Sequence, residues 1–183
     1  MKHRLAVAVP GLALLASCVP WTVRPIDDRQ SGPFDAERYV DSIWSSKVLP
    51  AAAQAADLAP TAPTAPTLVK GEGKVLSVDT TSRSGLIFLD LAPYDGRADA
   101  QLQIGPVIRG TALRDALPFI QFSQFTNQLE FARVGNALND RVVRTVLAGL
   151  STEGLAGRVV SFTGAAAGGA PLEIVPISLV VKP

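Results

Sequence analysis

Residues 101–117, QLQIGPVIRGTALRDAL, decide the fold because the chain changes there from a strand pattern to a helix pattern. Apolar and polar residues alternate at the start of this stretch, which predicts a strand over 101–108 that ends or bulges at Gly105-Pro106. Thr111 can then cap a short helix that runs to residue 117, because Pro118 disfavours helical geometry at the residue before it. A strand is thus followed directly by a helix.

Further strands are predicted on both sides of this stretch, at residues 73–79, 86–91, 158–163 and 172–181. The first two flank a Thr-Thr-Ser-Arg-Ser-Gly turn and should pair as a hairpin. The last two are joined by a turn of glycine and alanine at 164–169. Between the two pairs, residues 123–150 show the apolar spacing of a longer helix. Residues 128–133 also alternate like a strand, so both structures are open there.

The predicted order is strand, strand, strand, helix, strand, strand, which makes the fold mainly β with helices, in the α+β class. Five strands with a helix between the third and fourth is the order of an oligonucleotide/oligosaccharide-binding (OB) barrel, and closure of the barrel removes exposed sheet edges. We therefore expect an OB-like five-stranded barrel over residues 69–183. The alternative is an open α+β sheet with the long helix across one face.

An amphipathic helix is expected ahead of the barrel, over residues 34–58. Its apolar side chains recur near helical spacing, at Phe34, Val40, Ile43, Trp44 and Val48. We expect this stripe to pack in the core, with a contact surface at Trp44 as the alternative. The Ala-Pro-Thr repeat that follows makes 59–68 a linker or exposed loop. Helix, linker and barrel together form one globular domain over 34–183.

The N-terminus has the layout of a signal peptide over residues 1–17, with basic residues, an apolar run and then small residues. A bilayer span needs about 20 apolar residues, and this run is shorter and contains Pro10-Gly11, so we expect a cleavable leader. It ends in Leu-Ala-Ser-Cys at 15–18, which resembles the lipobox of bacterial lipoproteins.

Cys18 is therefore the expected lipid attachment site, with acyl chains such as palmitate that anchor the protein to the membrane. Residues 18–33 would form the lipidated tether. This places the protein at the periplasmic face of the bacterial cell envelope. Val19, rather than Asp, follows the cysteine and slightly favours the outer membrane over the inner one.

Composition excludes several kinds of chemistry. The chain has 183 residues with 17 Lys or Arg and 16 Asp or Glu, and loss of Lys2 and Arg4 with the leader leaves 15 basic residues. This near-neutral balance argues against nucleic acid as a partner. The single His, Met and Cys are His3, Met1 and Cys18. A Ser-His-Asp triad, a Cys-His pair and a His or Cys metal site are thereby excluded, and we expect no catalytic residue, metal or cofactor.

One group of polar residues flanks the short helix and the start of the long one. Its members are Arg109, Thr111, Arg114, Asp115, Asn127, Gln128 and Glu130. Guanidinium, amide and hydroxyl groups suit a ligand rich in hydroxyls or carboxylates, so we predict that this group binds a ligand or partner. The alternative is structural: Thr111 only caps a helix, Arg114 and Asp115 pair or are solvated, and the amides satisfy backbone groups.

Several segments resemble a family of predicted bacterial periplasmic lipoproteins of unknown function, a DUF family whose members contain a segment of the LQIGPVIRGTALRD type. They are LQIGPVIRGTALRD (102–115), VKGEG (69–73), VDTTSR (78–83), FTNQLEFA (125–132) and NALN (136–139). The resemblance covers most of residues 35–164. It implies an envelope lipoprotein, often encoded near sugar ABC transporters, with no established catalytic residue. The Ala-Pro-Thr repeat departs from the family pattern.

These observations predict a non-catalytic binding or accessory module that is associated with a carbohydrate ABC transport system. Its partners would be the membrane, through the N-terminal lipid, and ABC transporter components or a small polar ligand. One alternative is a carboxylate-dependent hydrolase that acts on envelope saccharides, for which Asp79, Asp90, Asp95, Asp99, Asp115 and Glu130 supply carboxylates. Another is a passive structural protein of the envelope.

Overall fold

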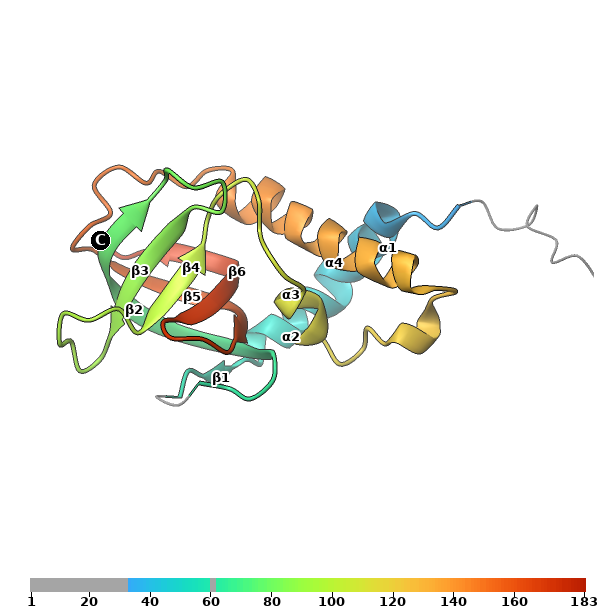
Figure 1. Ribbon diagram of the computed structural model, residues 1–183, viewed down its shortest axis with the longest axis horizontal. Coiled ribbons are helices and arrows are strands. Elements are labelled where there is room, and N and C mark those ends of the chain that lie inside the picture. Colours follow the sequence, from blue (N-terminus) through green and yellow to red (C-terminus); the bar gives the residue numbers. More distant parts are fainter. Residues whose placement is uncertain (1–32, 60–61) are drawn as a thin grey trace, which may run out of the picture. The chain divides into compact units, whose positions relative to one another are not determined.

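The computed structural model describes residues 33–59 and 62–183, and its folded unit runs from Phe34 to Pro183 (Figure 1). Cys18, the signal peptide over 1–17 and most of the tether lie outside the described residues.

Five strands close into a mixed barrel. They are β2 (Thr67–Asp79), β3 (Leu86–Leu91), β4 (Ala100–Gln103), β5 (Val159–Ala167) and β6 (Leu172–Val181). The order is β2-β3-β4-β6-β5, and β5 pairs back onto β2. The β4–β6 pair is parallel and the other four pairs are antiparallel. The predicted OB-like barrel is confirmed, and the open sheet is wrong.

The barrel interior is filled by alternate residues of the strands. Ile87 pairs with Leu102, which pairs in turn with Ile174, and all three side chains are fully buried. Glycine lets the strands approach closely at one point, because a Cβ on Gly164 would lie 2.4 Å from the carbonyl oxygen of Val175. This interior forms one of two hydrophobic cores.

Helices form a second layer against the outside of the barrel (Figure 1). The N-terminal helical stretch consists of α1 (Ala36–Ile43), a π-helical turn η1 (Trp44–Val48) and α2 (Leu49–Ala53). The segment between β4 and β5 forms α3 (Ala112–Asp115), a 3-10 turn η2 (Phe122–Gln124), α4 (Gln128–Val142) and a π-helical turn η3 (Val143–Leu147). Residues 128–133 are therefore helical. Among the described residues, no helix is both long enough and apolar enough to span a membrane.

The helical layer has its own core. Val40, Trp44 and Val134 are buried there together with Val175 and Ile177, which point outward from the barrel. Trp44 is only 5% exposed, so it packs in this core and the contact surface considered for it is wrong.

Several element boundaries differ from the prediction for physical reasons. β2 begins at Thr67, inside the expected linker, because residues 67–74 pair with β5 while 73–79 pair with β3. The expected turn at 164–169 is strand up to Ala167, because residues 164–166 pair with β2 and residues 164–167 pair with β6.

The N-terminal helix, the third strand and the long helix are shorter than predicted. The N-terminal helix ends at Ala53 rather than 58, because Ala56–Asp57 form a short strand, β1, that pairs in parallel with β2. The strand predicted over 101–108 ends at Gln103, where the chain turns toward Arg83 and Ser84. The long helix begins at Gln128 instead of residue 123, after the separate turn η2.

We predict that Gly164→Ala destabilises the full chain by about 2 kcal/mol, because the added methyl group overlaps the Val175 carbonyl. Gly149→Ala is the matched control: a Cβ there meets nothing within 4 Å, and its effect should stay within about 0.5 kcal/mol. Urea unfolding followed by the fluorescence of buried Trp44 measures both. Equal stability of the two variants would contradict the tight approach of β5 to β6.

Candidate functional site

Three of the predicted binding residues form a closed network on α3. Thr111 Oγ1 donates to Asp115 Oδ2 at 2.6 Å, and Arg114 Nε donates to Asp115 Oδ1 at 2.8 Å. Arg114 Nη1 also donates to the backbone carbonyl of Phe131, and its guanidinium carbon lies 3.8 Å from the centroid of the Phe131 ring. The Arg114 side chain is only 11% exposed. Arg114 therefore connects α3 to α4. This supports the alternative in which Arg114 and Asp115 pair with each other and have a structural role instead of binding a ligand.

The Thr111 side chain does not cap α3 as predicted. Its hydroxyl donates to Asp115 and makes no cap hydrogen bond to the helix backbone. The hydroxyl donates to the charged carboxylate of Asp115, which Arg114 also holds, and its oxygen accepts no backbone N–H of the helix.

Two further predicted residues cap α4. Asn127 Oδ1 accepts from the Glu130 backbone N–H at 2.9 Å, and Glu130 Oε2 accepts from the Thr126 backbone N–H at 2.9 Å. Such reciprocal bonds satisfy backbone donors that a helix start leaves without partners. Gln128 is exposed at the first position of α4. The two predicted groups adjoin through Arg114 and Phe131 but do not form one ligand-binding pocket of polar side chains.

Arg109, the last predicted residue, lies on the loop 104–111. The buried side-chain amides of Gln103 and Asn139 form hydrogen bonds to the backbone of this loop. Gln103 Oε1 accepts from the Arg109 backbone N–H at 2.7 Å, and Gln103 Nε2 donates to Glu173 at 2.9 Å and to the Arg109 carbonyl at 3.2 Å. Asn139 Nδ2 donates to the carbonyls of Ile108 and Gly110. These bonds fix the backbone of the loop and leave the Arg109 side chain exposed.

The same loop is fastened to the β2–β3 turn. Gly105 N–H donates to the Ser84 carbonyl at 2.7 Å, and Val107 N–H donates to the Arg83 carbonyl at 3.2 Å. Glycine is required at 105 because a Cβ would lie 2.3 Å from the Ser84 carbonyl carbon. The turn begins at Asp79, where hydrogen bonds from Thr81 lower the pKa of the carboxyl.

Together, the 104–111 loop and the β2–β3 turn present Arg83, Val107 and Arg109 on a rigid backbone. In OB barrels the loop between the first two strands takes part in ligand binding. We name this surface, made of Arg83, Val107 and Arg109, the loop site.

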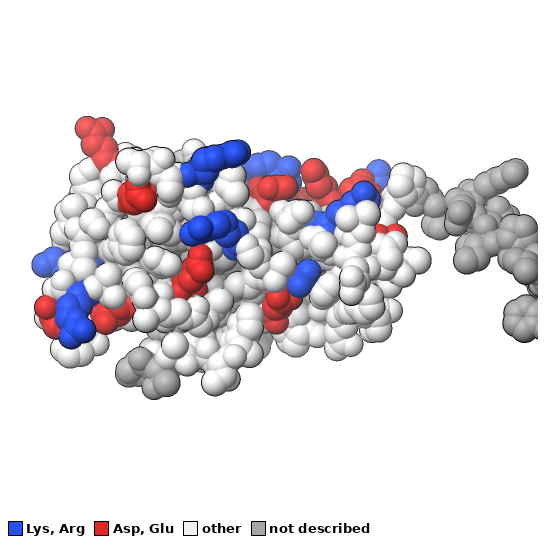
Figure 2. All heavy atoms as spheres, viewed as in Figure 1, with Lys and Arg blue, Asp and Glu red and all other residues white. Residues whose placement is uncertain are grey.

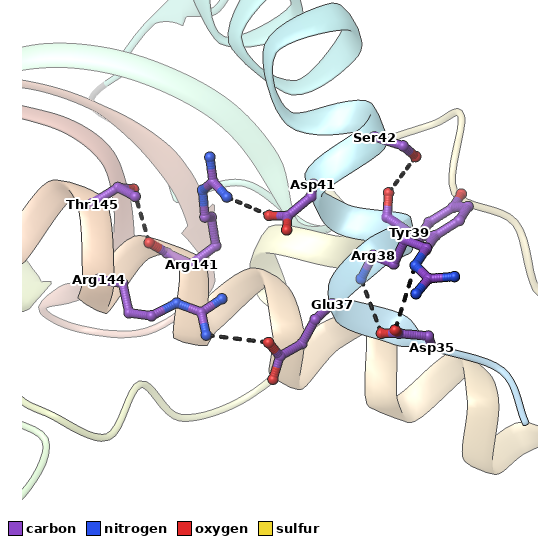
Figure 3. Close-up of polar contacts among 9 residues, drawn as sticks. All are labelled: Asp35, Glu37, Arg38, Tyr39, Asp41, Ser42, Arg141, Arg144 and Thr145. Carbon is purple, nitrogen blue, oxygen red and sulfur yellow. Dashed lines mark hydrogen bonds and ion pairs between the residues drawn. The ribbon is translucent and has the colours of Figure 1, made fainter.

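Ion pairs join the N-terminal helix to α4 and its continuation (Figure 3). Arg141 pairs with Asp41, and Arg144 pairs with Glu37 at 3.4 Å. The Arg141 guanidinium also lies 5.6 Å from the Trp44 ring. Arg144 and Glu37 are at least half exposed, so their contribution to stability is small. The pairs set the register of the two helices rather than form a ligand site.

Aromatic rings cluster where the described chain begins. Phe125 lies 5.5 Å from both Phe34 and Tyr39, centroid to centroid, and Phe131 lies 5.6 Å from both Phe125 and Phe122. Burial raises the pKa of the Tyr39 phenol. Phe122 is 49% exposed, so the cluster reaches from the core of the helical layer to the surface.

Several hollows lie on the described part of the barrel. One, of about 350 Å³, is a shallow depression on the outside of β2 and β5, lined mainly by polar residues such as Lys70, Glu72 and Thr163. Another, of about 250 Å³, lies at the β3–β4 loop and contains Asp95 and Asp99. A hollow of about 380 Å³ adjoins it at Asp99 and Leu172, and one of about 510 Å³ lies between the end of η3 and β6. Within residues 33–59 and 62–183, no three His, Cys, Asp or Glu side chains gather in a way that could hold a metal ion.

Sequence reasoning missed Gln103, Asn139 and Glu173. Gln103 and Asn139 are 1% and 6% exposed, yet a glutamine in an alternating strand and an asparagine in a helix read as surface residues. Their partners are backbone groups of a loop and a side chain 70 positions away, which no local pattern reveals.

Comparisons with known proteins bear on the family and the fold. The profile of a family described as "Predicted periplasmic lipoprotein (DUF2291)" matches residues 8–67 and 62–180. The crystal structure of an OB-fold protein from Thermotoga maritima is similar over 82% of this chain and 100% of its own, with a TM-score of 0.53 and 15% identity. An OBody bound to hen egg-white lysozyme matches over 65% of this chain and 79% of its own, with a TM-score of 0.34 and 17% identity. No curated protein sequence matches the chain.

We predict that Arg114→Ala and Arg109→Ala differ sharply in stability. Arg114→Ala removes bonds to Asp115 and to the Phe131 carbonyl together with the ring contact, and should lower the free energy of unfolding by about 2–3 kcal/mol. Arg109→Ala removes only an exposed side chain and should change it by less than about 0.5 kcal/mol. Urea unfolding of the full chain distinguishes them. A stable Arg114→Ala variant would leave Arg114 as a ligand-binding candidate.

Proposed function

The chain belongs to the family of predicted periplasmic lipoproteins, and from that premise we propose that export and lipidation of Cys18 anchor it at the periplasmic face of the envelope. The observation that carries the anchor is the sequence Leu-Ala-Ser-Cys at 15–18, which follows a basic and apolar leader. Two or more acyl chains, such as palmitate, hold a protein on a bilayer far more firmly than a single chain does. The residue after Cys18, Val19, favours the outer membrane.

We further propose that the folded part is a non-catalytic binding or accessory module. The support is the use of its polar residues: Arg114, Asp115, Asn127 and Glu130 hold helices together or cap them. In the hollow that contains two carboxylates, Asp99 accepts from the Leu91 backbone N–H and Asp95 from that of Arg97. These carboxylates organise their own loop, which favours a binding module over a hydrolase.

The loop site is the surface we propose for recognition of a partner. Its backbone is fixed by Gln103, Asn139 and the β2–β3 turn, so little conformational entropy is lost when it binds. The exposed Arg109 guanidinium supplies a planar fork of donors for a carboxylate or a carbonyl. We propose a component of a carbohydrate ABC transport system as the partner, following the family resemblance.

The anchor is tested by Cys18→Ala in cells that are fed labelled palmitate. We expect the variant to lose all label and to move from the membrane fraction to the soluble periplasmic fraction, because no other cysteine exists to accept a lipid. Ser17→Ala keeps a small residue before the cysteine and should retain both label and membrane association. An unlabelled wild-type protein would refute the anchor.

Recognition is tested by crosslinking intact envelopes and identifying the proteins recovered with the chain. Arg109→Ala should reduce recovery of transport components about tenfold, which corresponds to roughly 1.4 kcal/mol of binding free energy. Arg97→Ala removes an equally exposed arginine from the β3–β4 loop, outside the loop site, and should leave recovery unchanged. Equal losses in both variants, or no partner at all, would contradict the proposal.

A further inference from the structure

One end of the helical layer carries an exposed apolar surface, and the described chain enters the fold at the same end. Phe122 on η2 is 49% exposed and Leu129 in the first turn of α4 is 59% exposed. Side chains of a helix lean toward its N-terminus, so Leu129 leans toward the end where η2 lies. We name this surface, made of η2 and the first turn of α4, the helical tip.

The aromatic cluster connects the helical tip to the point where the chain enters. Phe34 contacts Phe125, Phe125 contacts Phe131, and Phe131 contacts Phe122, with centroid distances of 5.5, 5.6 and 5.6 Å. The starts of α1 and α4 and the turn η2 also lie at one end of the helical layer in Figure 1. The segment that precedes Phe34 therefore joins the fold beside the helical tip.

Length of chain limits how far the helical tip can be from a membrane. Fifteen residues separate Cys18 from Phe34, so the fully extended chain from Cys18 to Phe34 spans at most about 58 Å. A bilayer that holds acyl chains on Cys18 therefore lies within that distance of Phe34, which the aromatic cluster connects to the helical tip. Among the other large exposed apolar side chains of the described residues, Val107 belongs to the loop site, and Leu49, Tyr94 and Val180 are scattered singly on other elements, as is normal for a surface.

Charge at the helical tip suits a lipid interface. No charged residue occurs from Ala116 to Leu129, and on the face drawn in Figure 2 this segment forms an uncoloured surface with charged atoms along its border. Among the bordering groups, Lys47 lies 5.9 Å from the Phe119 ring, and Arg133 is exposed one turn after Leu129. The nearby acids have partners: Asp115 accepts from Arg114, Glu130 accepts from the Thr126 N–H, and Asp35, next to Phe34, accepts from the Arg38 N–H and pairs with the Arg38 side chain.

We propose that the helical tip docks on the bilayer surface in which Cys18 is anchored, with Phe122 and Leu129 at the level of the lipid headgroups. This inference rests on the proposed lipid anchor. The acyl chains hold the protein, and the helical tip fixes its orientation. Because the anchor already keeps the tip within reach of the lipid, two apolar side chains are enough to favour the docked state.

The experiment uses the full lipidated chain in vesicles of phosphatidylethanolamine and phosphatidylglycerol. The sulfur of Cys18 is blocked by lipid, so a cysteine introduced by Ser123→Cys carries the only nitroxide label. Ser151→Cys is the control, since it is exposed beyond the far end of α4 and η3, about 30 Å away. Collision of each label with a water-soluble nickel chelate measures its exposure to water.

On reconstitution into vesicles, we expect the collision frequency of the label at 123 with the nickel chelate to fall at least about threefold. The collision frequency of the label at 151 should not change. Adding Phe122→Ser and Leu129→Ser should restore the collisions at 123. Leu129 is mostly exposed, and Phe122 is about half exposed and contacts the Phe131 ring, so far-UV circular dichroism checks that the variant is folded.

Each other outcome overturns the proposal in a distinguishable way. Vesicles that float with the protein but leave both labels equally accessible refute docking and retain the anchor. Protein that does not float with the vesicles refutes the anchor itself. Protection at 123 that appears only after envelope proteins are added assigns the helical tip to a protein partner instead.

Discussion

Closure of the barrel is the constraint on which the rest of the structure depends. Five closed strands leave an interior that side chains such as Leu102 and Ile174 fill completely, so no helix can enter it. β4 and β5 follow each other along the chain but are not neighbours in the barrel, because β6 lies between them in the strand order. The connection from β4 to β5 starts at Ile104, includes α3 and α4, and buries its apolar face against the outside of the barrel. Because the barrel interior is already filled, the helices form a separate hydrophobic core on the outside of the barrel.

The polar residues of this second layer resemble a ligand site because they hold α3, and the loop before it, in place. α3 has four residues, and besides its buried Leu113 it is held by Arg114, which donates to the Phe131 carbonyl and lies over the Phe131 ring. The loop before α3 is irregular, and Gln103 and Asn139 satisfy its backbone groups. A short helix and an irregular loop are therefore held in place by arginine, amide and hydroxyl groups. The same residue types would recognise a saccharide, and only geometry separates the two roles.

The sequence predicted the barrel because strand order follows from local alternation, and alternation survives wherever one face of a strand is buried. The predicted strand boundaries were wrong where pairing with a strand far away in the sequence decides whether a residue is in a strand. Thr67–Glu72 is strand because β5 supplies the ladder partner, and Ala165–Ala167 is strand because β2 and β6 supply the partners. Of the predicted site, Arg109 alone lies on the loop site. Arg114 was read as a possible ligand group because burial by Phe131, 17 positions later, leaves no local signal.

In the arrangement we propose, the order of elements along the chain separates the lipid anchor from the recognition surface. The tether joins at Phe34, beside the helical tip, while α4 and η3 extend about 30 Å from the tip along the barrel. The C-terminus lies on the barrel, away from the end where the described chain begins (Figure 1). A protein anchored through Cys18 and docked by its helical tip therefore projects its barrel from the bilayer, with the helical layer as a spacer. The loop site, fixed by Gln103 and Asn139 between barrel and helices, then faces partners at a set height above the membrane.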